Sequence, residues 1–417
     1  MRFALIVLLF GSLIAPAAMS QQTPKLAPKK ATRAVKATKL TREQNFILQT
    51  VQSAVALSQP DPQDRLRVLN SAAHVTASIA PKYSTQLAKE GVELESFLVA
   101  NGQTPMVSIM ASGRADCATM KAFVEPLNEQ AIYVAEQSLI GAISKCPKMT
   151  LELVRQKADF ALDKGLIAPR LLMALMEKSG AGSAWTQERF PKLFSSLPDA
   201  TTETSKLAAP DYASMYASLA PKIGKDVARS TGLKLFAWLG KVEVSSERSV
   251  AVNITASAME EALGKEKYQE VLEQDIIVRQ LVEAKGPPAE LPPVEVESAS
   301  VLRAMGGKGT EQQADLRELP PSLRAREAAA HGFARGIAQD KDSASSFFDM
   351  AFSAADETWS QRARIKNAAG VVEEVSEAAA HVDALDALRR AQGLQDPTAQ
   401  ALGMIAVARV VSGRDTR

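Results

Sequence analysis

The chain has 417 residues, enough for two or three domains, and its 46% apolar content is ordinary for a globular protein. Aromatic residues make up only 5% and alanine is abundant, which argues against β-sheet, because sheets draw on aromatic and β-branched side chains. The 49 basic and 47 acidic residues nearly cancel, so the formal charge of +2 does not single out a class of partner.

The first twenty residues have the three regions of a secretory signal peptide. Arg2 supplies a positive start, residues 3–14 are almost entirely apolar, and Ala18-Met19-Ser20 gives the small residues that precede a cleavage site. The alternative is an uncleaved membrane anchor, but the apolar stretch is short for a bilayer and Pro16 closes it. We therefore expect cleavage near Ser20–Gln21 and an exported protein, periplasmic or extracellular, with no transmembrane segment.

Residues 21–40 have almost no large apolar side chains, so they cannot bury enough surface to fold, and we expect a disordered arm. This arm is either a spacer or is attracted to anionic wall polymers or lipid. Nucleic acid is a poor partner, because no aromatic residues are interleaved with the charges and the chain is expected to be exported. Its region holds seven basic residues and no acidic one: Lys25, Lys29, Lys30, Arg33, Lys36, Lys39 and Arg42.

Helical patterning begins at Thr41, which can form a capping box with Gln44. Asp61 can cap the next segment, where apolar residues recur at three- and four-residue spacing from residue 66. Similar stripes, separated by Gly or Pro, continue to residue 284. We expect a main helical domain over residues 41–284, interrupted at 179–210 by a loop that carries one short helix.

Residues 285–322 contain four Pro or Gly pairs and predict a linker, followed by a smaller helical domain over residues 323–413. Several segments repeat one arrangement, in which a short polar break separates two apolar helices. The predicted fold is therefore all-α with essentially no β-sheet, an α-solenoid-like helical-repeat array of antiparallel helix pairs. The alternative is an irregular α-helical bundle, since no standard repeat consensus is present.

The two cysteines, Cys117 and Cys146, are an even count in a chain expected to meet an oxidising environment, which favours one disulfide. Such a bridge would stabilise the fold by roughly 3–4 kcal/mol in the chain-entropy model. The alternative is a pair of buried free thiols. A redox-active pair is not expected, because there is no Cys-x-x-Cys.

No catalytic motif stands out. The sequence lacks Gly-x-Ser-x-Gly, Ser-x-x-Lys, His-Glu-x-x-His and a Cys/His zinc cluster. The segment 306–310 resembles a phosphate-binding loop only superficially, because Gly309 stands where Ser or Thr would hold magnesium. We expect no catalytic residue and no cofactor.

Two identical segments carry the metal-ligand candidates, Glu327 with His331 and Glu377 with His381. Each Glu and His pair lies four residues apart, on one face of a helix, and two facing helices could offer four ligands. The alternative is a solvated contact or a duplicated helix. We expect no bound metal.

These patterns predict an exported, non-enzymatic scaffold or protein-binding protein of the cell envelope, whose partner is an unknown envelope protein or peptide. The alternative is a helical-fold cell-wall glycan hydrolase or lytic transglycosylase, which fits the compartment and needs only one or two acidic residues. A metal-binding helical domain around His331 and His381 ranks below both.

Overall fold

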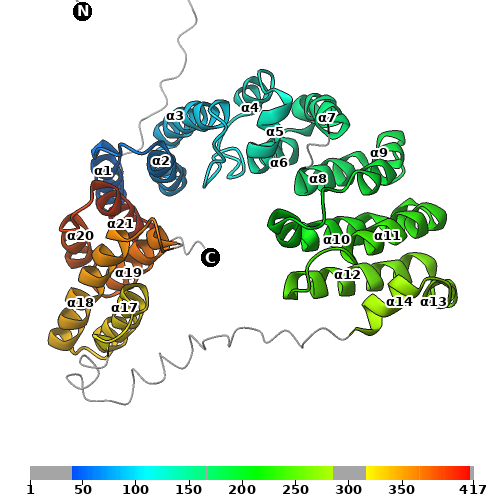
Figure 1. The fold of residues 1–417 in the computed structure, drawn as a ribbon. Helices are drawn as coiled ribbons and strands as arrows, with labels where there is room; N and C mark the ends of the chain where they lie inside the picture. The colour runs from blue at the N-terminus through cyan, green and yellow to red at the C-terminus, as the bar shows by residue number, and fades with distance from the viewer. Residues whose placement is uncertain (1–39, 165–167, 285–315, 366, 414–417) are drawn as a thin grey trace, which may run out of the picture. The chain divides into compact units, whose positions relative to one another are not determined.

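The computed structural model describes residues 40–164, 168–284, 316–365 and 367–413, and these contain nineteen α-helices and no β-strand (Figure 1). The prediction of an all-α fold is confirmed. The signal peptide, its cleavage site and most of the basic arm lie outside the described residues. No described helix is both long and apolar enough to cross a lipid bilayer.

The helices of the first half are α1 (Arg42–Ala56), α2 (Pro62–Thr76), α3 (Pro81–Ala100), α4 (Cys117–Val124), α5 (Glu129–Val134), α6 (Glu136–Lys145), α7 (Pro147–Asp163), α8 (Pro169–Ser179) and α9 (Ala184–Ser195). Those that follow are α10 (Glu203–Ile223), α11 (Lys225–Leu239), α12 (Ser246–Leu263), α13 (Lys265–Gln274), α14 (Ile276–Glu283), α17 (Pro321–Ile337), α18 (Lys341–Ser360), α19 (Ala368–Val382), α20 (Ala384–Gln392) and α21 (Pro397–Val411).

Side chains at the helix starts explain many of these boundaries. Thr41 and Gln44 form the predicted capping box of α1, each accepting a backbone N–H of the other at 3.1 Å. Asp61 caps α2, also as predicted, by accepting the Gln63 N–H at 2.8 Å. Proline stands in the first turn of α2, α3, α7, α8, α17 and α21, where its missing N–H costs nothing.

The expected loop over residues 179–210 is largely helical. The expected short helix is α9, but α10 already begins at Glu203, so residues 203–210 belong to a helix. Thr202 caps α10, and the buried residues Ser205 and Ala209 begin an inward face that continues along the helix. Pro210 lies inside α10 because burial of this face outweighs the backbone hydrogen bond that proline removes.

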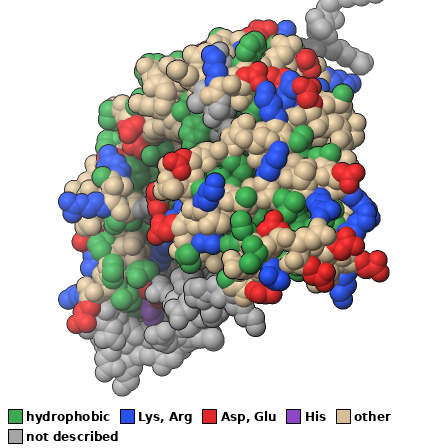
Figure 2. All heavy atoms as spheres, turned by 45° about the vertical axis from the view of Figure 1, so that its right-hand side comes forward, with side chains coloured by type: hydrophobic (Ala, Val, Ile, Leu, Met, Phe, Trp, Pro, Cys, Tyr) green, Lys and Arg blue, Asp and Glu red, His purple; other side chains and the backbone are tan. Residues whose placement is uncertain are grey.

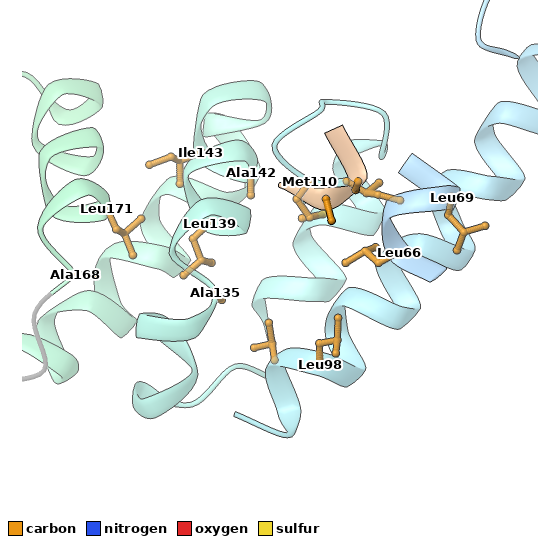
Figure 3. Packing of buried hydrophobic residues seen from close by; sticks show 14 of the residues in the cluster. Leu66, Leu69, Leu98, Met110, Ala135, Leu139, Ala142, Ile143, Ala168 and Leu171 are labelled. Carbon is orange, nitrogen blue, oxygen red and sulfur yellow. The ribbon is translucent and has the colours of Figure 1, made fainter. Parts of the chain in front are cut away.

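The core is formed mainly by small and aliphatic side chains between successive helices. Figure 3 shows labelled side chains of α2, α3, α6 and α8 lying between these helices, together with Met110 of the segment that joins α3 to α4. Glycine lets this segment approach closely: a Cβ on Gly141 of α6 would come within 2.5 Å of the Ala111 backbone. Scarce aromatics and abundant alanine therefore serve close helix packing.

Most helices from α1 to α14 contact the next helix in the chain, and α21 contacts both α1 and α2. The helices that precede α21 also pack among themselves, with α17 against α18 and α19, and α19 against α20 and α21. The C-terminal helices therefore continue the packing of the N-terminal helices, although about 340 residues of sequence separate α1 from α21.

Helices α17 and α19 run in the same direction. Arg326 bonds Glu374, with Nε to Oε2 at 2.6 Å, and the ring of Phe333 lies 6.1 Å from that of His381. Both contacts join residues 48 positions apart, as parallel neighbours require. Successive pairs in a helical repeat have this relation. The described helices vary from six to 21 residues in length, and a regular repeat stays a prediction.

A buried carboxylate fixes the segment between α3 and α4. Glu95 of α3 is fully buried and accepts hydrogen bonds from the hydroxyls of Ser108 and Ser138 and from the N–H of Ile109, the last at 3.0 Å. The N–H of Met110 is a fourth donor, at 3.4 Å. Burial raises the pKa of Glu95, and these four hydrogen-bond donors act in the opposite direction. The carboxylate joins α3, the connecting segment and α6 at one point.

Replacing Glu95 by Ala should lower the free energy of unfolding by roughly 3 kcal/mol, because two hydroxyls and two backbone N–H groups lose their acceptor. Glu95→Gln should cost less and should flatten the pH dependence. With a raised pKa in the folded state, Glu95 contributes less stability as the pH rises above the ordinary glutamate range, and glutamine does not titrate. Urea unfolding from pH 4 to 8 measures both effects, and equal pH slopes for the unaltered chain and the Glu95→Gln variant would contradict this account.

The contact of α21 with α1 and α2 makes a second prediction. After cleavage at a specific protease site inserted within residues 285–315, the two fragments should still elute together in gel filtration. The apolar surface of α21 holds them together without the covalent connection. Separate elution in native buffer, rather than only in denaturant, would contradict the packing described here.

Candidate functional site

The four metal-ligand candidates are not assembled into one site. The His331 side chain of α17 is only 5% exposed, and its ring stacks on Phe347 at a centroid distance of 5.0 Å. Glu377 of α19 bonds Arg409 at 2.6 Å, and His381 is exposed beside Phe333. Among the described residues, no group of three or more His, Cys, Asp or Glu could hold a metal ion.

Of the predicted basic arm, the structure describes only Arg42, which is the exposed first residue of α1. The other six basic residues lie outside the described residues. On the face shown in Figure 2, acidic and basic side chains are interspersed with hydrophobic ones. A partner of that face would meet a mixed surface without one dominant charge.

The predicted disulfide is present and ties together the starts of two helices. Cys117 is the first residue of α4, Cys146 immediately precedes α7, and their Cα atoms are 5.5 Å apart. The Cys146 side chain is buried and that of Cys117 is partly exposed. The bond therefore fixes α4 beside α7 at their N-terminal ends.

A lysine ties the other end of α4 to α7. Lys157 of α7 donates from Nζ to the carbonyl oxygens of Glu125 at 3.0 Å and Leu127 at 2.5 Å. These carbonyls lie at and just beyond the C-terminal end of α4, where backbone acceptors lack partners within the helix. With the disulfide at one end and Lys157 at the other, the separation of α4 and α7 is fixed.

Beside the contact between Lys157 and these carbonyls lies a hollow of about 250 Å³, between α7 and the turn that joins α4 to α5. Leu127 enters from the turn, Leu153 and Phe160 enter from α7, and the wall is completed by Glu125, Asn128, Gln156 and Lys157. The Phe160 ring is 61% exposed at the edge of the hollow. A concave site with apolar walls and few polar groups suits an apolar side chain of a partner.

The hollow continues a stripe along the outer face of α7, which we call the α7 stripe: Met149, Leu153, Gln156 and Phe160. Met149 is 42% exposed, Leu153 is half-buried, and Gln156 is exposed. The opposite face of α7 is buried in the core through Thr150, Val154, Ala158, Ala161 and Leu162. One apolar face of α7 packs in the protein's own core, so the second face is available for contact with another molecule.

The sequence predicts helical stripes along this part of the chain, but it does not predict the second apolar face of α7. The signal was present, because Met149, Leu153 and Phe160 recur at spacings of four and seven residues beside the inward series that begins at Thr150. Which of the two series faces the core depends on contacts with α4, α5, α6 and α8, and these become visible only in the structure.

A second hollow, of about 420 Å³, lies beside α17 and α18 and is lined mainly by polar groups. Two of its charged side chains already have partners, since Arg324 pairs with Glu357 and Asp349 pairs with Arg390. Glu95, the acid most deeply buried in the described helices, does not reach solvent. The α7 stripe, with its exposed apolar groups and adjoining hollow, is therefore the better candidate site.

Comparison with known proteins gives no relative from which a role could be transferred. No protein-family model matches the chain, no curated protein matches it, and no solved structure matches it. The role of the α7 stripe is therefore argued from its geometry and chemistry alone.

His331 should make the stability of the C-terminal helices depend on pH. Its Nδ1 has no hydrogen-bond partner, and burial, with Arg335 nearby, lowers its pKa below the ordinary value of 6.5. The unfolded chain therefore binds a proton at a higher pH than the folded chain, so this residue should cost stability as the pH falls below about 6.5. His331→Phe, which keeps a ring on Phe347, should flatten that loss in thermal unfolding between pH 7 and 5.

His381→Phe is the matched control, because it makes the same exchange at an exposed position of α19. A His331→Phe protein whose stability falls as steeply with acid as that of the unaltered chain would show that His331 is not the group responsible.

Proposed function

We propose that the protein is an exported, non-enzymatic helical scaffold of the cell envelope that binds another protein chain through the α7 stripe. The observation that carries this proposal is the hollow lined by Leu127, Leu153 and Phe160, with the Phe160 ring 61% exposed at its edge. Interfaces take most of their binding energy from a few apolar anchors that fill such hollows.

The way the hollow is built supports a binding role. Its two walls are fixed relative to each other by the disulfide at Cys117 and by the bonds from Lys157 to the backbone of residues 125 and 127. A binding surface that does not reorganise loses less free energy to ordering when a partner arrives. The disulfide also suits an oxidising compartment, in keeping with the export expected from the first twenty residues.

The basic arm adds a second contribution in this proposal. Its six positive charges, together with Arg42 at the start of α1, would hold the protein near anionic wall polymers or lipid, while the helices engage the partner. Attraction of this kind is diffuse and weakens as salt is added, whereas docking into an apolar hollow does not. Salt dependence therefore separates the two contributions.

Recovery of a partner from envelope extracts should depend on Phe160. Phe160→Asp puts a charge at the edge of the hollow and should reduce recovery at least about tenfold at moderate salt, because a desolvated apolar anchor is lost. Quantitative pull-down with the mature protein as bait measures this.

Phe97→Asp is the control, since Phe97 is also a large exposed apolar residue, 55% exposed, but lies on α3 away from the hollow. Both variants should retain the thermal stability of the unaltered chain. A discrete partner recovered equally by Phe160→Asp and by the unaltered bait would count against the α7 stripe as the binding site.

A further inference from the structure

We infer that the chain bound at the α7 stripe is a second copy of this protein, with the two α7 helices side by side and parallel. The inference rests on the proposed function, since it names the partner of the same surface. It is carried by the register of exposed apolar and charged residues along α7.

The stripe has the spacing of a short coiled-coil seam. Met149, Leu153, Gln156 and Phe160 are separated by four, three and four residues, which places them at successive d, a, d and a positions of a heptad. Val154, Ala158, Ala161 and Leu162 then fall at positions b, f, b and c, and all four are buried in the protein's own core. The seam thus points away from the core, toward a neighbouring molecule.

The charges that flank the seam favour a parallel copy. Glu152 falls at a g position and Lys157 at the following e position, five residues later. In a parallel pair of helices, g of one chain faces e of the next heptad in the other, so Glu152 would meet Lys157 of the second copy twice across the dimer. One heptad further on, Asp159 falls at g and Lys164 at e, but Asp159 already pairs with Arg189 at 2.6 Å and accepts from the Trp185 indole, so the pairing rests on Glu152 and Lys157.

The existing partners of these groups leave the pairing possible. Glu152 is 70% exposed; within its own chain it pairs with Arg155 at 3.3 Å and accepts a hydrogen bond from the Gln156 amide at 3.5 Å. Lys157 bonds backbone carbonyls and no carboxylate, so its positive charge is not neutralised there. In an antiparallel pair, g would face g instead, so Glu152 would lie near Asp159, which Arg189 already neutralises, and would lose the contact with Lys157.

The seam is short, which sets the expected strength of the dimer. From Met149 to Phe160 it extends roughly 16 Å along α7, about three helical turns. An apolar contact of this size supports reversible rather than permanent association. Gln156 at a d position weakens the seam further but favours one register, because its amide is satisfied best by the same residue of the partner.

Sedimentation velocity on the mature protein tests the inference. We expect a reversible monomer–dimer equilibrium, weakened roughly tenfold by Phe160→Ala and unchanged by Phe97→Ala. Glu152→Lys and Lys157→Glu should each weaken self-association when studied alone. An equal mixture of the two variants should dimerise again, because every g–e pair between unlike chains then joins opposite charges.

The mixing experiment separates pairing from misfolding, since a folding defect in either variant cannot be repaired by adding the other. A chain that is monomeric at every concentration overturns the inference. A dimer whose dissociation constant is unchanged in Glu152→Lys and Lys157→Glu also overturns it. If the chain is monomeric while recovery of another envelope protein still depends on Phe160, the proposed function stands without this inference. If neither depends on Phe160, both fail.

Discussion

The burial of α21 on all sides is the constraint on which the rest of the structure depends. From Ala401 to Ala408 every residue is buried, so this helix has no face that can remain in water. Helices α19 and α20 cover one part of it, and α1 and α2 cover another. The helices at the two ends of the described chain therefore share one core.

Charged groups at the end of α21 join this helix to α19 and α2. Arg409 lies against Glu373 and Glu377 of α19, and its side chain is only 13% exposed. Burial raises the pKa of Glu373, while Arg409 and Arg67 of α2 act in the opposite direction. Arg67 belongs to the N-terminal helices, so the same small cluster joins elements from both ends of the chain.

Local features of the fold could be predicted because they depend on neighbouring residues. The capping box at Thr41, the cap at Asp61 and the Cys117–Cys146 bond follow from residue types and spacing, and the structure confirms them. The start of α10 at Glu203 was missed, because Pro210 is a strong local signal that burial of the helix overrides. The contact between α21 and α1 has no local signal at all.

The candidate site was missed for the same reason. The α7 stripe is the apolar face that remains exposed when α4, α5, α6 and α8 cover the other face of α7. The sequence shows both faces but not which one the core takes. The fixed separation of α4 and α7, set by Cys117–Cys146 and Lys157, then turns the exposed face into the wall of a hollow.

The central claim is that the folded helices, rather than the basic arm, carry the specific contact. Photo-crosslinking in intact envelopes from a reactive amino acid placed at Gln156, in chains with and without residues 21–40, tests it directly. The account predicts one discrete crosslinked protein species, present in both chains. Crosslinks only to wall polymer or lipid, lost when the arm is removed, would contradict it.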